Sequence, residues 1–214
     1  MPQPQNSHFV CKFFSFCLTR YSNGTTKLFL GHILGSDEGG EAILVDPGEF
    51  DVVLLDSIES NSFNTTTVLV THNHERHIRG LKILKKIHDV RIISGDEETG
   101  DSESAAVGDR TEASGISIKI LDLEERLTRS KIFRIGNLLF TGNILSAGRI
   151  GNSISSEKRA LLMADIQEKI LAIPEDLLIL PSCGPPSTIG AELRWNPNFH
   201  PQNQGYGAES SALL

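Results

Sequence analysis

Short apolar runs rich in β-branched and aromatic residues recur along this chain, with Gly, Asp, Asn or Pro between them. Runs of this kind predict β-strands. The first two, 8–21 and 27–34, are separated by Asn23-Gly24, a pair that favours a tight turn, so they predict a β-hairpin. Further strands are predicted at 42–45, 65–70, 90–93, 116–121, 135–143 and 177–180.

Helical periodicity of apolar residues predicts helices at 50–60, at about 79–88 and at 153–173. The last is the strongest, because serines are available to cap its start and Pro174 follows its end. We expect it to lie against a sheet through its apolar positions, which are 161, 162, 166, 170 and 173.

The segment 95–115 interrupts this pattern, because it carries seven acidic residues against the single Arg110 and few large apolar side chains. Such a composition predicts a solvated, mobile surface loop. A calcium-binding loop is the alternative, although the spacing of the acids is not that of an EF-hand.

A chain of 214 residues with 39% hydrophobic residues can fill one core but is short for two. We therefore expect a single domain over residues 8–200. Residues 1–7, with two prolines, predict a flexible leader, and residues 201–214, without periodicity, predict a disordered tail.

The formal net charge of -7 argues against nucleic acid as a partner, since nucleic-acid-binding domains are usually basic. Three cysteines without paired spacing fit a reducing compartment. No apolar run approaches the roughly 18 residues of a membrane span, and Lys12 interrupts the N-terminal apolar stretch. These features predict a cytoplasmic protein that binds neither membrane nor nucleic acid.

Candidate chemistry is concentrated at the end of the run Val68-Leu-Val70, where His72, His74 and His77 follow within a few residues. In extended backbone His72 and His74 project to the same side, and His77 falls where a helix is predicted to begin. Imidazoles gathered at a strand end are typical of zinc sites. A cluster of surface histidines in a loop is the alternative.

This stretch resembles the signature of the metallo-β-lactamase fold superfamily, Thr-His-x-His-x-Asp-His-x-x-Gly. The matching residues are Thr71, His72, His74, His77 and Gly80, and Arg76 stands where the family has its Asp. Asp46-Pro47-Gly48 resembles an earlier family motif. The resemblance implies an α+β fold, a four-layer αββα sandwich of two mixed β-sheets flanked by helices.

The later motifs narrow the resemblance to the hydroxyacylglutathione hydrolase (glyoxalase II)-like branch. That branch has Thr-x-x-x-Glu followed by Asn-Pro-Phe, and this chain has Thr188, Glu192, Asn196-Pro197 and Phe199. The resemblance covers about residues 9–199, with five motifs in the family's order.

The resemblance also implies seven positions that would bind two metal ions. This chain keeps only His72, His74 and His77 of the seven. The other four former-ligand positions hold two cations, a neutral amide and a thiol, which are Arg76, Arg126, Asn143 and Cys183. Three of seven ligands are too few for a dinuclear site, so the metal site is predicted to be degenerate.

Electrostatics bears on whether one metal ion could still bind. An Arg about 5 Å from a dication is repelled by roughly 6–7 kcal/mol at an effective dielectric near 20. Zinc sites have binding free energies of about 10–16 kcal/mol. We therefore expect no cofactor, or at most one zinc held by His72, His74, His77 and Cys183.

The leading functional prediction is a non-catalytic binding or regulatory domain, a pseudoenzyme. Its former metal pocket, lined by Arg76, Arg126, His72 and His74, would bind a small anion such as phosphate, sulfate or a carboxylate. The alternative is a mononuclear zinc hydrolase of a thioester, and a third reading is a metal-independent Cys/His enzyme.

Two further alternatives concern single residues. The arginines could instead pair with acids such as Asp46, Glu75 or Glu124 and fill the volume left by the metals. Cys183 could be a thiolate ligand or a buried thiol that acts as a small apolar filler.

Overall fold

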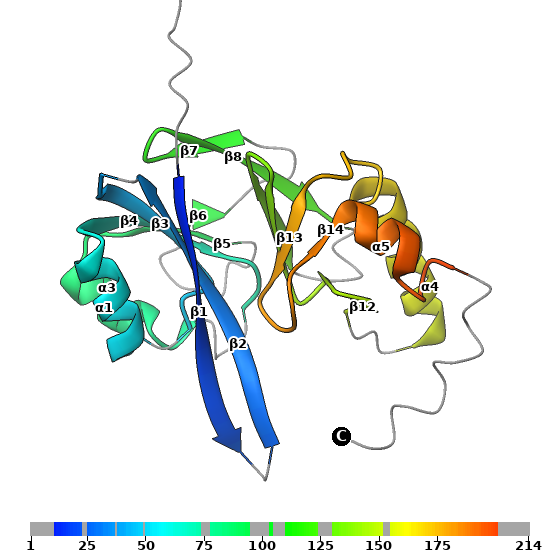
Figure 1. The fold of residues 1–214 in the computed structure, drawn as a ribbon, viewed down its shortest axis with the longest axis horizontal. Helices are drawn as coiled ribbons and strands as arrows, with labels where there is room; N and C mark the ends of the chain where they lie inside the picture. The colour runs from blue at the N-terminus through cyan, green and yellow to red at the C-terminus, as the bar shows by residue number, and fades with distance from the viewer. Residues whose placement is uncertain are drawn as a thin grey trace, which may run out of the picture.

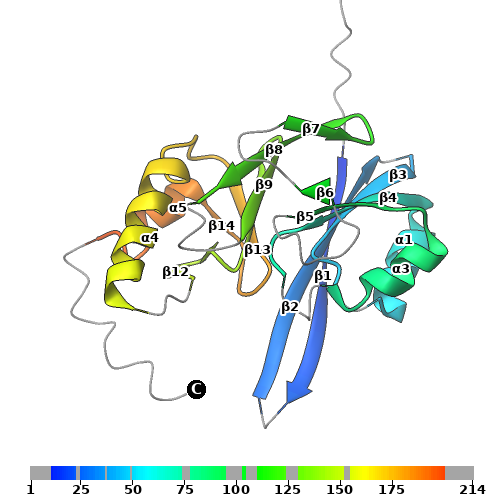
Figure 2. The same cartoon turned by 180° about the vertical axis from the view of Figure 1, so that it is seen from behind.

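The computed structural model describes residues 11–22, 25–36, 38–48, 50–73, 78–94, 103–104, 110–123, 130–151 and 155–200. Two six-stranded sheets dominate these residues, and Figures 1 and 2 show helices on the outer side of each sheet. A small two-stranded hairpin, β11–β12, forms a third sheet. The leader 1–7 and the tail 201–214 lie outside the described residues, so the domain bounds stay a prediction.

The first sheet has the strand order β1-β2-β3-β4-β5-β6. Its first three strands are antiparallel and the others run parallel. The strands are β1 (Cys11–Ser22), β2 (Thr25–Ser36), β3 (Gly40–Val45), β4 (Phe63–Val70), β5 (Arg91–Ser94) and β6 (Glu103–Ser104). The predicted N-terminal hairpin is therefore confirmed as β1–β2.

The second sheet has the order β14-β13-β10-β9-β8-β7, with one parallel pair, β10–β13, among antiparallel ones. Both sheets are thus mixed. The strands are β7 (Arg110–Ala113), β8 (Ile116–Asp122), β9 (Lys131–Ile135), β10 (Leu138–Gly142), β13 (Leu178–Pro181) and β14 (Ser187–Thr188); the separate hairpin is β11 (Leu145–Ser146) and β12 (Arg149–Ile150).

Helices α1 (Val52–Ser60) and α3 (Leu81–Ile87) cover the first sheet, and α4 (Ser156–Lys169) and α5 (Ile189–Trp195) cover the second. Three of the four begin at a side-chain cap. Asp51 accepts a hydrogen bond from Leu54 N at 3.0 Å, Ser155 from Lys158 N at 3.2 Å and Thr188 from Ala191 N at 3.1 Å. Among the described residues, none of the helices combines the length and the apolar composition that a membrane span requires.

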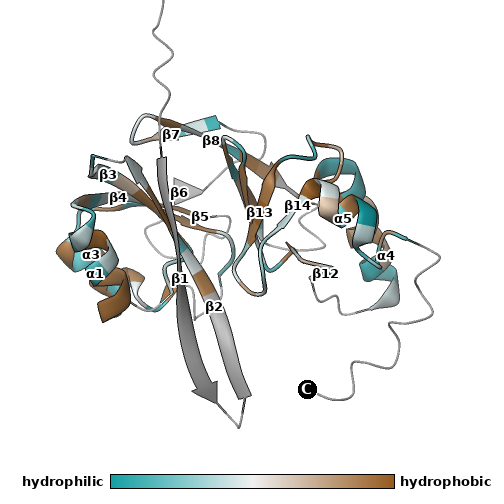
Figure 3. Ribbon diagram, in the orientation of Figure 1, coloured by the Kyte–Doolittle hydropathy of each residue, from teal (hydrophilic) through white to brown (hydrophobic). Residues whose placement is uncertain are grey.

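Buried apolar side chains form three layers, one between the sheets and one under each pair of helices. Strand β4 shows the alternation that builds them, because Val68 and Val70 pack toward α1 and α3 while Leu69 packs between the sheets. Figure 3 shows apolar residues along the strands of both sheets. The α+β four-layer αββα sandwich is therefore confirmed.

Three details of the sequence-based prediction are wrong. The acidic segment 95–115 is not a loop throughout, because Arg110–Ala113 forms β7 and pairs with β8. The predicted strand 135–143 is instead the end of β9, a turn at Gly136 and then β10. The helix predicted at 153–173 ends as α4 at Lys169, and residues 170–173 turn to bring the chain to β13.

Leu161 is also misassigned, since 43% of its surface is exposed while Leu162 and Ile166 are buried. Consecutive helical residues point about 100° apart, so Leu161 lies at the margin of the apolar face to which Leu162 belongs. At the C-terminal end of the described residues, Nε2 of His200 lies 2.5 Å from the Leu193 carbonyl oxygen. Residues 95–102 and 105–109 lie outside the described residues.

A tight contact inside the first sheet gives a test of this packing. A Cβ added at Gly35 would lie 2.4 Å from Cε1 of Phe63, so Gly35→Ala should lower the free energy of unfolding by about 1–3 kcal/mol through overpacking. Urea denaturation measures the loss. In a Phe63→Leu background the same substitution should cost less, and an equal cost in both backgrounds would show that the ring is not the obstacle.

Candidate functional site

Four strand ends, two from each sheet, meet at one edge of the sandwich. Strands β3 and β4 end at Val45 and Val70, and β10 and β13 end at Gly142 and Pro181. The residues that follow these ends are joined by hydrogen bonds across the two sheets, with Asp46 at the centre. This edge carries the residues that the sequence analysis singled out.

Asp46 follows β3 and is 2% exposed. Its Oδ1 accepts a hydrogen bond from Thr71 N at 2.8 Å, and its Oδ2 accepts from the Thr71 hydroxyl at 2.6 Å and from the Ser182 hydroxyl. Its φ of 47° lies in the left-handed region, which Asp tolerates better than most residues. One buried carboxylate therefore links β3, β4 and β13.

The Thr71 hydroxyl determines the hydrogen-bonding role of Nδ1 in His72. Because this hydroxyl donates its only hydrogen to Asp46, it acts as the acceptor toward His72 Nδ1, 2.9 Å away. We therefore assign a hydrogen to Nδ1 of His72. The His72 side chain is half-buried.

Asn143 reaches the same edge through Gly142. Gly142 has a φ of 57°, and a Cβ there would lie 2.5 Å from the Thr71 hydroxyl oxygen, so only Gly lets β10 approach β4 this closely. The next residue, Asn143, is exposed, and its Oδ1 accepts a hydrogen bond from the Ser130 hydroxyl at 3.1 Å. Lys131 N donates to the Thr71 carbonyl at 2.7 Å and fixes that segment beside His72.

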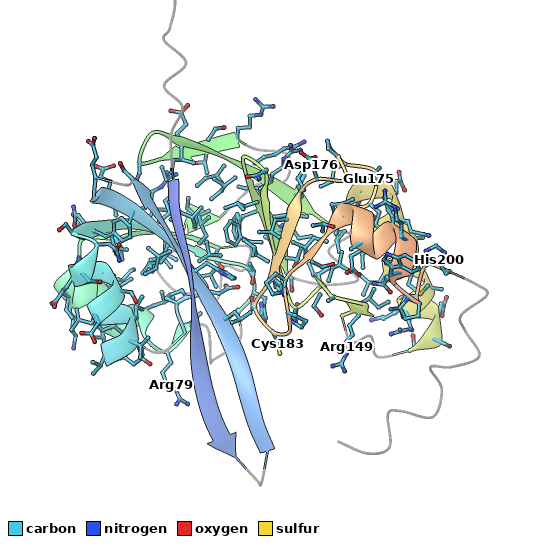
Figure 4. All side chains as sticks on the ribbon, in the orientation of Figure 1. Arg79, Arg149, Glu175, Asp176, Cys183 and His200 are labelled. Atoms are coloured by element: carbon cyan, nitrogen blue, oxygen red, sulfur yellow. The ribbon has the colours of Figure 1, made fainter. Side chains whose placement is uncertain are left out.

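Cys183 follows Ser182, whose backbone N–H donates to the Gly142 carbonyl at 2.8 Å. The structure thus brings His72, Asn143 and Cys183 to one edge from three distant parts of the chain. Cys183 is an exposed free thiol, and Figure 4 shows it at the turn after β13. The alternative that Cys183 is a buried apolar filler is therefore wrong.

The remaining candidates, His74, Arg76, His77 and Arg126, lie outside the described residues. Among the described residues, no group of three His, Cys, Asp or Glu side chains comes together at a spacing that would hold a metal ion. The described part of the edge offers the imidazole of His72, the amide of Asn143 and the thiol of Cys183. The full ligand set, and the pairing of the arginines, stay predictions.

His32 is a buried group that the sequence analysis missed. It is 1% exposed, and its ring centroid lies 5.3 Å from that of Phe140. Burial lowers the pKa of His32 to about 4, although the charge of Asp46 and a hydrogen bond with the Pro181 backbone act in the opposite direction. The only signal in the sequence was a His within an apolar strand.

A second buried carboxylate, Glu192, holds the loop that follows Asn143. It accepts hydrogen bonds from Gly148 N, at 3.1 Å to Oε2, from Asn196 Nδ2 at 2.6 Å and from the Ser187 hydroxyl. Nδ2 of Asn198 in turn donates to the Gly148 carbonyl at 3.3 Å. These contacts give a structural role to the Glu192 and Asn196 motif of the sequence analysis, because they fasten the β11–β12 hairpin to α5.

Comparison with known proteins agrees with this architecture. The family model of the metallo-beta-lactamase superfamily matches residues 34–137, a range that includes β3, β4 and the segment from Asp46 to Gly80. The chain contains a metallo-β-lactamase superfamily domain. The family resemblance predicted from the sequence is therefore confirmed.

Two relatives of this superfamily domain are hydroxyacylglutathione hydrolases. The protein of Klebsiella pneumoniae subsp. pneumoniae is 29% identical over 147 residues, which are 67% of this chain and 57% of that protein. The protein of Erwinia tasmaniensis is 26% identical over 176 residues, which are 78% of this chain and 66% of that protein. The chain thus spans less than two thirds of the relatives' length.

Among solved structures, that of the BLEG-1 B3 metallo-beta-lactamase superposes with a TM-score of 0.74 at 19% identity. The superposition covers 88% of this chain and 99% of that one. At this identity the similarity shows the fold alone. The relatives are consistent with the glyoxalase II-like branch.

Removal of the Asp46 charge tests its role as the link between strands. Asp46→Asn should lower the free energy of unfolding by roughly 2–4 kcal/mol, because two hydroxyl groups and one backbone N–H lose a charged acceptor in a buried place. Chemical denaturation measures this loss. The matched control, Asp56→Asn on the exposed side of α1, should change stability by less than about 0.5 kcal/mol.

His32 gives a prediction for pH dependence. Its pKa of about 4 in the folded state lies below the unfolded value of 6.5, so between these values the unfolded chain binds more protons. Stability should therefore fall as the pH is lowered from about 6.5 to about 4, by roughly 3 kcal/mol in total. In His32→Gln this part of the slope should disappear in urea titrations; an unchanged slope would assign the effect to other groups.

Proposed function

We propose that this domain binds a small anion at the edge where the four strands end, and that it is not a dinuclear metallohydrolase. The observation that carries the proposal is Asn143, whose oxygen already accepts a hydrogen bond from Ser130. The amide NH₂ group can only donate, which suits an anion and not a cation. In the family that the sequence resembles, this position holds the Asp whose carboxylate bridges the two metals.

The positive charge around this edge supports the proposal. In the sequence, two former-ligand positions hold arginines, Arg76 and Arg126. Of the described residues, Arg79 and Arg149 are exposed and extend from the same side of the molecule as Cys183 (Figure 4). The chain as a whole has a net charge of -7, so a general excess of basic residues does not explain these arginines. Guanidinium groups suit phosphate, sulfate or carboxylate as ligand.

The relatives' hydrolase activity is not carried over to this chain. The chain spans only 57% and 66% of the length of the two hydroxyacylglutathione hydrolases, and four of the seven metal positions that the resemblance implies hold other residues. An anion held by arginines and amide donors needs no metal ion. Its affinity should fall with added salt, because the attraction is largely electrostatic.

A second candidate function, a mononuclear zinc hydrolase of a thioester, is favoured by the state of His72. Histidines that bind zinc through Nε2 usually donate their Nδ1–H to a neighbouring oxygen, as His72 does to the Thr71 hydroxyl. His72, His74, His77 and Cys183 would hold the ion, which would activate a water molecule for hydrolysis. In that case Asp46 and Thr71 would orient His72.

Binding of inorganic phosphate and sulfate, followed by isothermal titration calorimetry, tests the proposal. Arg149→Gln should weaken phosphate binding about fivefold or more, because one exposed guanidinium leaves the edge. The control is Arg134→Gln, whose Nε donates to the Gly136 carbonyl in the turn at the opposite end of β10. Equal affinity in Arg149→Gln and the unmodified protein would contradict an anion site at this edge.

Zinc analysis separates the two candidates. Protein purified without chelator should contain well below one zinc per chain and should not hydrolyse thioesters. The fourfold variant Arg76→Asp, Arg126→His, Asn143→Asp and Cys183→His should raise the zinc content sharply, because it removes two positive charges and restores four ligands. Stoichiometric zinc in the unmodified protein, lost together with thioesterase activity in His72→Ala, would instead establish the hydrolase.

A further inference from the structure

The outer surface of α1 and α3 exposes large apolar side chains that the fold does not use. Val52 and Val53 of α1 are 70% and 52% exposed, and Ile83 and Ile87 of α3 are 48% and 57% exposed. Figure 3 shows apolar residues on these two neighbouring helices. Single exposed apolar residues are common, but a group of four on two adjacent short helices is typical of an interaction surface.

The same two helices carry charge of opposite sign. Residues 51–60 contain three acids and no Lys or Arg, and residues 79–88 contain four Lys or Arg and no acid. The exposed members are Asp56 and Glu59 on α1, and Lys82, Lys85 and Lys86 on α3. We call the surface formed by these charged residues and the four apolar ones the α1/α3 face.

The two helices lie side by side on the first sheet (Figures 1 and 2). Each is followed by a parallel strand of this sheet, so α1 and α3 run in the same direction. Gly80 N donates to the Gly48 carbonyl at 2.8 Å, which holds the start of α3 beside the loop that leads into α1. The apolar and charged residues are therefore arranged in two adjacent, parallel rows.

We propose that the α1/α3 face binds a second copy of this chain. A two-fold axis that runs between the helices and along them places α1 of one copy on α3 of the other. Val52 and Val53 then meet Ile83, and the acids of α1 meet Lys85 and Lys86, twice in each dimer. Apolar contacts in the middle with complementary charges around them are the usual composition of a protein interface.

An anionic membrane is the competing partner for a helix with exposed isoleucines between lysines. The charge of α1 argues against it, because Asp56 and Glu59 would face the same lipid phosphates as the lysines beside them. A second copy of the chain would pair with both the acids of α1 and the lysines of α3. The same reasoning disfavours a partner of one charge, since either helix would then be repelled.

Charge reversal tests the proposal by sedimentation velocity over a range of concentrations. The unmodified protein should form a concentration-dependent dimer. Lys85→Glu with Lys86→Glu, and separately Asp56→Lys with Glu59→Lys, should each raise the dimer dissociation constant at least tenfold, because the paired charges become alike. Lys158→Glu on α4, at the other side of the molecule, should leave it unchanged.

Mixing the two double variants gives the decisive measurement. The lysine reversals add acids to α3 next to the acids of α1, and the acid reversals add lysines to α1 next to the lysines of α3. An equimolar mixture of the two variants should therefore form a heterodimer, identified by native mass spectrometry. Circular dichroism of each variant excludes loss of fold as the cause of weaker self-association. A monomeric unmodified protein, or a dimer that the reversals and the mixture leave unaffected, would overturn the proposal. Binding to phosphatidylcholine–phosphatidylserine vesicles, abolished by the lysine reversals, would overturn it in favour of the membrane.

Discussion

The buried carboxylate of Asp46 is the interaction on which the edge of this sandwich depends. It receives donors from Thr71 at the end of β4 in the first sheet and from Ser182 at the end of β13 in the second. Hydrogen bonds to a charged acceptor are worth about 1.5–3 kcal/mol each, more than neutral ones. The two sheets are therefore held in one relative position at the place where His72, Asn143 and Cys183 emerge.

Glu192 has a similar role for the loop that follows Asn143. Like Asp46, it is a buried carboxylate surrounded by donors, and it holds the Gly148 backbone and the Asn196 side chain in place. Neither carboxylate belongs to the seven metal positions that the resemblance implies. The scaffold of the edge can therefore persist in a chain whose former-ligand positions carry Arg76, Arg126, Asn143 and Cys183, because different residues hold the loops and line the site.

The edge and the α1/α3 face are close neighbours in the structure. The hydrogen bond between Gly80 N and the Gly48 carbonyl ties the start of α3 to the loop that follows Asp46. Residues that position His72 and residues that begin the two outer helices thus belong to the same short segments. A partner bound to α1 and α3 would therefore contact helices whose first residues directly adjoin the segments around Asp46 and His72.

The sequence by itself determined the fold class, most of the elements and the family. These depend on local signals, such as the alternation around Leu69, the caps at Asp51 and Ser155, and the spacing of His72, His74 and His77 in the chain. Such signals act within a few residues, so periodicity and turn chemistry reveal them. The errors fell where local signals compete, as at Leu161 and in the acidic segment, where pairing with β8 made Arg110–Ala113 a strand.

Only the tertiary structure decided what surrounds the candidate residues. It showed that Asp46 accepts hydrogen bonds from Thr71 and Ser182, that the Thr71 hydroxyl lies 2.9 Å from Nδ1 of His72, and that Cys183 is exposed. It also placed His32 in the interior, where its pKa falls to about 4. Asp46 and Ser182 are 136 residues apart, and no local pattern in a chain encodes which distant donors and acceptors will meet.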